Sequence, residues 1–182
     1  MMRKDITLYV PKLEELDYRQ KILSQEGTMS YNKGHDINNK NYHKETGCID
    51  FPNSEWESWY KAWVTNKPER FYAYIKRSTD KKFIGEVNLH FDAEHDWYEM
   101  GIVIEENCRG NCYSVAAVKS LLKIAFEEFN ANGVHNNFEY NRHNAIQAHV
   151  DAGFRIIDNY EGFVDVYISK TQYLDSLESN KS

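Results

Sequence analysis

The sequence predicts an α+β (mixed α/β) fold in which a mostly antiparallel, mixed sheet of about seven strands is flanked by about four helices. Three observations point to this class. A length of 182 residues suits one domain, at about 150 residues per domain. Contents of 41% hydrophobic and 27% charged residues are those of an ordinary globular protein. Segments with a period of two alternate along the chain with segments of helical period.

The N-terminal third predicts one strand and two helices around a long polar segment. Alternation predicts a strand over 5–10, and Pro11 opens a helix that extends to about residue 25. Residues 26–52 are polar and aperiodic, and a loop of that length is expected to act as a lid or a binding wall. A capping box from Ser54 to Glu57 starts the next helix. Its aromatic stripe either packs on the domain, the commoner role, or stacks a substrate, and it consists of Trp56, Trp59, Tyr60 and Trp63.

The rest of the chain supplies the other strands and helices. Turn-separated strands over 71–77, 82–91 and 97–105 have the spacing of a meander. A helix from Tyr113 is expected to end near Asn132, with Gly133 as its C-cap glycine. The remaining elements are a strand over 134–140, a helix over 143–152, and strands over 154–158 and 163–170. The domain therefore spans 5–170, and 171–182 forms a C-terminal tail.

Composition excludes several classes of function. The net charge is −6 and no Lys/Arg cluster exists, so nucleic acid is not an expected partner. The chain has neither an 18-residue apolar run nor a signal-peptide core, so no membrane association is expected. Three cysteines are too few for a disulfide framework, and they indicate a reduced, cytoplasmic protein. The sequence does not determine the oligomeric state.

The junction at residues 104–114 is the strongest candidate for binding chemistry. A strand there ends in a short loop that leads directly into a helix, which leaves unpaired N–H groups at the helix start. These donors and the positive end of the helix dipole favour an anion such as pyrophosphate, and Arg109 adds a cation. Neither the P-loop pattern nor the dinucleotide-binding glycine pattern occurs in the chain.

A family resemblance rests on these residues. The run Glu99-Met-Gly-Ile-Val-Ile, Arg109-Gly-x-x-Tyr113 and a later helix ending in Ala152-Gly153-Phe154 together resemble the GNAT superfamily of acetyl-CoA-dependent N-acetyltransferases. The likeness spans roughly 5–170, and the Glu-x-Gly strand is most similar to the ribosomal-protein N-acetyltransferase-like branch. It implies direct transfer of an acetyl group from acetyl-CoA to a primary amine.

The resemblance also implies a CoA site. Its loop, whose backbone amides would hold the pyrophosphate, comprises Arg109, Gly110, Asn111, Cys112, Tyr113 and Ser114. The preceding strand would splay from its neighbour, so that backbone groups of Ile102, Val103 and Ile104 pair with the pantetheine arm. Asn141 or Asn144 would contact the same arm. Cys112 replaces a glycine of the family pattern, which strains the backbone if that position needs a positive φ and is tolerable otherwise.

Two residues are candidates for the acid–base chemistry. The resemblance places a general base at Glu99, whose alternative role is that of a solvated strand carboxylate. Glu86, Asn88 and His90 share one face of the neighbouring strand, and the register of the hairpin decides whether Leu89 or His90 lies opposite Glu99. His149 replaces the tyrosine that usually protonates the thiolate, and it acts either as that acid or in packing.

Other functions and ligands are weighed against this one. A metal site is not expected, because Cys108-x3-Cys112 lacks two further ligands. No metal-ligand spacing occurs at His35, His43, His95, His135 or His143. The alternatives are a non-catalytic acyl-CoA-binding or sensing domain of the same fold and a nucleotide- or phosphate-sensing regulator that uses the same helix N-terminus. The acceptor could be a protein N-terminus, an amino acid, a polyamine or an aminoglycoside, and the acidic net charge favours a cationic amine.

Overall fold

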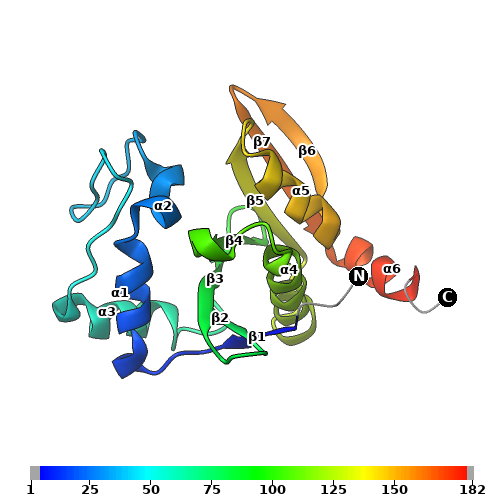
Figure 1. Ribbon diagram of the computed structural model, residues 1–182. Coiled ribbons are helices and arrows are strands. Elements are labelled where there is room, and N and C mark those ends of the chain that lie inside the picture. The colour runs from blue at the N-terminus through cyan, green and yellow to red at the C-terminus, as the bar shows by residue number, and fades with distance from the viewer. Residues whose placement is uncertain (1–4, 180–182) are drawn as a thin grey trace.

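A computed structural model describes residues 5–179, which form one seven-stranded sheet with helices on both faces (Figure 1). The strands lie in the order β1-β2-β3-β4-β5-β7-β6. All neighbours pair antiparallel except β4 and β5, which are parallel, so the predicted mixed, mostly antiparallel sheet is confirmed. The strands are β1 Ile6–Tyr9, β2 Arg70–Arg77, β3 Phe83–Asp92, β4 Trp97–Ile104, β5 Gly133–Glu139, β6 Arg155–Tyr160 and β7 Phe163–Ser169.

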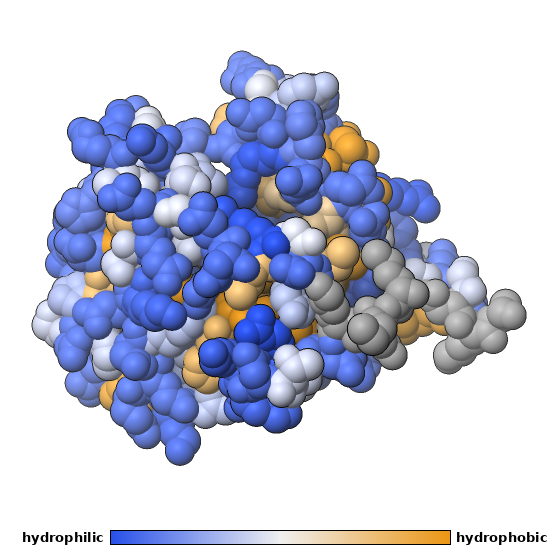
Figure 2. Space-filling model, viewed as in Figure 1, coloured by the Kyte–Doolittle hydropathy of each residue, from blue (hydrophilic) through white to orange (hydrophobic). Residues whose placement is uncertain are grey.

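The helices cover the two faces of the sheet in separate groups (Figure 1). Val87 and Leu89 of β3 join the large core beneath α4 and α5. On the opposite face, Glu86 of β3 contacts α1 and His90 contacts α3. The helices are α1 Asp17–Leu23, α2 Glu26–Met29, α3 Asn53–Trp63, α4 Tyr113–Lys123, α5 His143–Ala152 and α6 Lys170–Ser179. The viewed face is predominantly hydrophilic (Figure 2), and no helix within 5–179 has the length and apolarity to cross a bilayer.

The helix predicted over 11–25 is wrong in its extent, and a tyrosine hydroxyl explains why. A 3-10 turn over Leu13–Glu15 precedes α1, which begins at Asp17. Arg19 N donates to Tyr74 Oη at 3.3 Å, and that hydroxyl donates to Glu15 O at 2.9 Å. The hydroxyl is thus inserted between two backbone groups that a continuous helix would join directly.

Two predicted helix boundaries are also wrong. Pro52 is the N-cap of α3 with no side-chain cap, so Ser54 lies inside the helix and makes no capping box. After α4, a π-helical turn over Ile124–Glu128 ends the helical segment before Gly133. Gly133 instead starts β5, where a Cβ would lie 2.2 Å from the hydroxyl of Tyr167. Asn130, with φ 55°, takes the left-handed position that the C-cap glycine was expected to occupy.

Two segments contain more structure than the sequence predicted. The loop 26–52 includes α2 and a 3-10 turn over Ser30–Asn32. The segment assigned to a C-terminal tail includes most of α6, whose buried Tyr173 stacks on Phe126 of the core at 4.7 Å. The division between a domain at 5–170 and a tail stays a prediction. The stripe of α3 packs on the domain as expected, since Trp59 contacts Phe51 and Tyr72.

Candidate active site

The parallel strands β4 and β5 meet briefly and then diverge. Within residues 5–179 they pair at two positions, Tyr98 with Val134 and Glu99 with His135. Beyond this point β4 continues beside β3 as far as Ile104, and β5 continues beside β7 as far as Glu139. We call the divergent residues 100–104 and 136–139 the β4–β5 fork. Its existence confirms the predicted splay, and it leaves the edge of β4 at Ile102–Ile104 without a partner from β5 in the described structure.

The loop between β4 and α4 has the backbone shape that the family pattern requires. Gly110 has φ 72°, and Cys112, the N-cap of α4, has φ 60° and ψ 14°. The position therefore does need a left-handed backbone, so the cysteine is strained there. The side chain of Cys112 makes no capping hydrogen bond at the N-terminus of α4, whose first N–H groups belong to Tyr113 and Ser114. The amides and the positive dipole end of a helix start, beside the open edge of β4, fit the phosphates and the amide-bearing arm of acetyl-CoA.

Arg109 is engaged by the protein itself. Its guanidinium donates to the carbonyl of Ile104 at 3.1 Å and to those of Gly27 and Thr28 at 3.2 and 2.6 Å. Thr28 also accepts a hydrogen bond from the backbone N–H of Glu106 at 3.1 Å. Arg109 therefore docks the loop onto α2, and its contact with the phosphates of CoA stays a prediction.

The turn after β5 brings further expected residues to the same end of the sheet. Parallel strands have their carboxyl ends at one edge, so this turn lies near the β4–α4 loop, and α4 contacts α5. Asn141 is exposed in the turn and Asn144 is exposed in the first turn of α5. Their contact with the pantetheine arm stays a prediction.

Glu99 lies where the fork begins and is held by two neighbouring side chains. His135 Nδ1 lies 2.7 and 2.9 Å from its carboxylate oxygens, and the Trp97 indole N–H donates to Oε1 at 2.8 Å. Trp97 stacks on the His135 ring at 4.7 Å, and Asp165 Oδ2 lies 3.8 Å from His135 Nε2. The side chain of Glu99 is 26% exposed and that of His135 is 9% exposed. Of these two, Glu99 is therefore the one more accessible to a substrate.

The charges of this group shift two pKa values in opposite directions. Partial burial acts to raise the pKa of Glu99, but the hydrogen bond and charge of His135 outweigh it, so the pKa lies below its ordinary value. Burial acts to lower the pKa of His135, but Glu99 and, to a smaller extent, Asp165 outweigh it, so that pKa is raised. The register of the β3–β4 hairpin, which the sequence left open, places His90 and not Leu89 opposite Glu99.

His149 lies in an environment unsuited to the acid role expected for it. It is 1% exposed, with Phe138 and Phe154 against its ring. Nδ1 lies 2.9 Å from the carbonyl of Ala145, so it donates there, and Nε2 lies 3.2 Å from Asn136 Nδ2 and accepts. Burial lowers its pKa to about 4. The imidazole is neutral near pH 7 and its one N–H is already bonded, which supports the packing role that the sequence left open.

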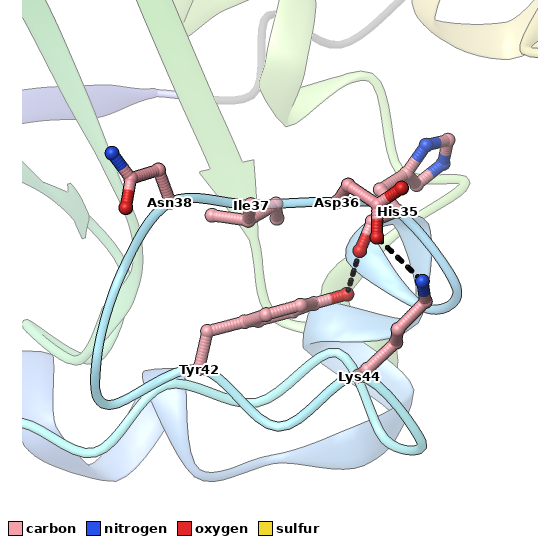
Figure 3. A pocket seen from close by; sticks show the side chains of 6 residues that line it. All are labelled: His35, Asp36, Ile37, Asn38, Tyr42 and Lys44. Carbon is pink, nitrogen blue, oxygen red and sulfur yellow. Dashed lines mark hydrogen bonds and ion pairs between the residues drawn. The ribbon is translucent and has the colours of Figure 1, made fainter.

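The segment after α2 spans the open end of the fork. His35 Nε2 lies 2.8 Å from Glu139 of β5, and the guanidinium of Arg142 lies over the ring of Tyr31 at 4.9 Å. Residues of the same segment also line an open hollow of about 320 Å³ (Figure 3). The Tyr42 hydroxyl donates to the His35 carbonyl at 3.1 Å and Lys44 pairs with Asp36 at 2.5 Å. The hollow contains none of the residues expected to bind CoA.

Comparisons with known proteins identify the family. A family model described as an acetyltransferase (GNAT) domain matches residues 7–155. The spermidine N-acetyltransferase from Vibrio cholerae, solved with CoA and spermine, is similar with a TM-score of 0.73 and 16% identity, covering 94% of this chain and 99% of that chain. Apo FdhC, described as a nucleotide-linked sugar GNAT, has a TM-score of 0.69 and 17% identity, covering 98% and 94%. No curated protein matches the chain by sequence.

The chain belongs to the GNAT acetyltransferase family. It is an acetyl-CoA-dependent enzyme that transfers an acetyl group to an amine. The narrower assignment to the ribosomal-protein branch stays a prediction. Sequence reasoning missed Trp97, His135 and Asp165 as partners of Glu99. His135 was considered only as a metal ligand, although its place at the start of the strand parallel to β4 is the signal that finds it.

Proposed function

We propose that the acceptor is a small cationic primary amine and that Glu99 removes its proton at the start of the β4–β5 fork. The observation that carries the proposal is the partly exposed Glu99 carboxylate, which lies where the unpaired edge of β4 begins. An amine held there would lose a proton to Glu99, and its nitrogen would form a bond to the thioester carbonyl carbon. The C–S bond would then break, and CoA would leave as a thiolate that takes up a proton from the solvent. Backbone groups of Ile102–Ile104 and the N-terminus of α4 would hold acetyl-CoA.

Charge on the same face of the sheet supports a cationic acceptor. Glu139 lies on the same face of β5 as His135, and Asp165 approaches the same histidine from β7, so their carboxylates share the face of Glu99. A similar enzyme was solved with spermine, a polyamine. The free thiols of Cys48, Cys108 and Cys112 further support a reduced, cytoplasmic location.

A panel of amines tests the proposal. The purified chain is incubated with acetyl-CoA and spermidine, a neutral amino acid, an aminoglycoside or a peptide with a free N-terminus, and thiol release and acceptor mass are measured. We expect amine-dependent release, with higher kcat/KM for the polycationic acceptors. Preference for the neutral amino acid would refute the acceptor class. Thermal stabilisation by acetyl-CoA, worth about 2.7 kcal/mol at a hundredfold excess over Kd, independently reports the CoA site.

A further inference from the structure

One row of side chains crosses five strands at the level of Glu99. The register places Arg70 of β2 opposite His90 of β3, His90 opposite Glu99 of β4, Glu99 opposite His135 of β5, and His135 opposite Tyr167 of β7. Glu99 therefore lies between two histidines. Only His135 is bonded to it in the described structure, whereas Nδ1 of His90 is buried without a hydrogen-bond partner.

His135 can keep its hydrogen bond to the Glu99 carboxylate in both of its protonation states. In the neutral form, Nδ1–H donates to the Glu99 carboxylate and Nε2 carries a lone pair. In the protonated form, Nε2–H faces Asp165 Oδ2 at 3.8 Å. The other oxygen of Asp165 is buried without a hydrogen-bond partner among the described residues, so this carboxylate is available to stabilise a charged imidazole. Trp97, stacked on the ring, holds the imidazole in this place.

We propose that His135 is a positioning residue for the base Glu99: neutral His135 orients the carboxylate, and protonated His135 pairs with it and withholds it from the acceptor amine. The inference rests on the proposed role of Glu99. One proton moves in the step, from the amine nitrogen to a Glu99 oxygen, and His135 keeps its Nδ1–H throughout. His135, being largely buried, acts through Glu99 and does not touch the substrate.

The surroundings of His135 determine the direction of the effect. Carboxylates favour its protonated form, because Glu99 and Asp165 raise its pKa. The activity should therefore rise as the pH increases through the pKa of His135, well above the range where Glu99 titrates. The titratable and charged groups near it come from β4, β3, β7 and the β3–β4 turn, and they are Glu99, His90, Asp165, Tyr167, His95 and Asp96.

Rate profiles against pH test the proposal with variants that separate orientation from titration. His135→Gln retains an N–H donor but cannot be protonated, so the acid limb of kcat should move to lower pH. At pH 6 it should retain at least about threefold more of its own plateau rate than the wild type retains. Asp165→Asn should move the limb in the same direction by a smaller amount. Asp151→Asn is the matched control for Asp165→Asn, because Asp151 is exposed on α5 and accepts a hydrogen bond from Gln147 at 2.7 Å.

Nuclear magnetic resonance titration of the labelled histidines supplies a readout that needs no turnover. We expect the His135 pKa to lie above that of an exposed histidine and to fall in Glu99→Gln, which removes the carboxylate charge. An active enzyme whose acid limb is the same in His135→Gln and Asp165→Asn would overturn the inference alone. A His135 pKa that is unchanged in Glu99→Gln would also overturn it. The absence of acetyl transfer to any amine would instead refute the proposed function, and the inference with it.

Discussion

Glu86 and Glu99 lie on the same face of the sheet, and each is paired with a cationic or titratable side chain. Glu86 is 4% exposed and binds Arg19 and the Tyr72 hydroxyl, while Phe51, Trp59 and Tyr72 surround the guanidinium. Arg19 is permanently charged, and Glu86 is too deeply buried for a substrate to reach. Glu99 is partly exposed and its partner His135 can lose its charge. A buried carboxylate with a permanently charged partner thus joins elements of the fold, whereas an accessible carboxylate with a titratable partner can perform proton transfer.

The largest effect is expected on the activity, when Glu99, the reactive one of the two carboxylates, is replaced. Glu99→Gln preserves shape and the hydrogen bond from Trp97 but removes the proton acceptor. We expect kcat to fall by about 10²–10⁴-fold with little change in affinity for acetyl-CoA, measured by thiol release and by calorimetry. Part of the loss should be recovered at high pH, where more of the amine is already deprotonated. A kcat close to that of the wild type would make Glu99 a solvated strand carboxylate.

Replacement of Glu86, the buried one of the two carboxylates, should lower the stability of the fold. Glu86→Gln leaves the Arg19 guanidinium buried without a counter-charge, which should lower the free energy of unfolding by about 3–5 kcal/mol in urea denaturation. Replacing both partners, Arg19→Met with Glu86→Leu, should recover most of this loss, because no buried charge remains. Equal stability of Glu86→Gln and the wild type would erase the distinction between the two carboxylates.

The free energy of unfolding is also expected to depend on pH, through His149. Its pKa is about 4 in the folded chain against an ordinary 6.5, so protons bind preferentially to the unfolded chain between these values. Stability contributed by neutral His149 is complete above pH 6.5 and is lost as the pH falls towards 4, by roughly 3 kcal/mol in all. His149→Phe should flatten the dependence of unfolding free energy on pH over this interval. An unchanged slope would mean that the ring is accessible to protons.

The smallest effect tests the strained loop. Cys112→Gly removes a side chain from a residue at φ 60° and should stabilise the chain by about 1 kcal/mol. Gly110→Ala is the reciprocal control, since Gly110 has φ 72° and open space around its Cβ position, and it should destabilise by a similar amount. Thermal denaturation measures both. Destabilisation by Cys112→Gly would show that the thiol makes compensating contacts.

The parts of the fold that sequence could predict are those set by local pattern. The meander, the loop before α4 and the final strands follow from periodicity and turn residues. The register of the β3–β4 hairpin does not, because it depends on Asp96 adopting φ 58° so that Asp92 pairs with Trp97. The break before α1 depends on the hydroxyl of Tyr74, 59 residues from Glu15.

The candidate site likewise has a part that a local sequence pattern predicts and a part that it does not. The family pattern placed Glu99 and the loop at 109–114, because these residues are close together in sequence. His135 lies 36 residues from Glu99, and the partners of Arg109 on α2 lie 81 and 82 residues away. Such contacts exist only after the strands and helices have packed, so no local pattern indicates them.

The strand order has a consequence for how the molecule is made. Strands β1–β4 lie side by side in the order in which they are synthesised, and β5, β7 and β6 are added to the β4 edge afterwards. A chain growing on the ribosome therefore contains the residues of all four of these strands before Gly133 is added. The β4–β5 fork needs residues of both halves, so it cannot form before β5 has been synthesised. A nascent chain that stopped before β5 would display Glu99 on an open edge strand, without His135 beside it.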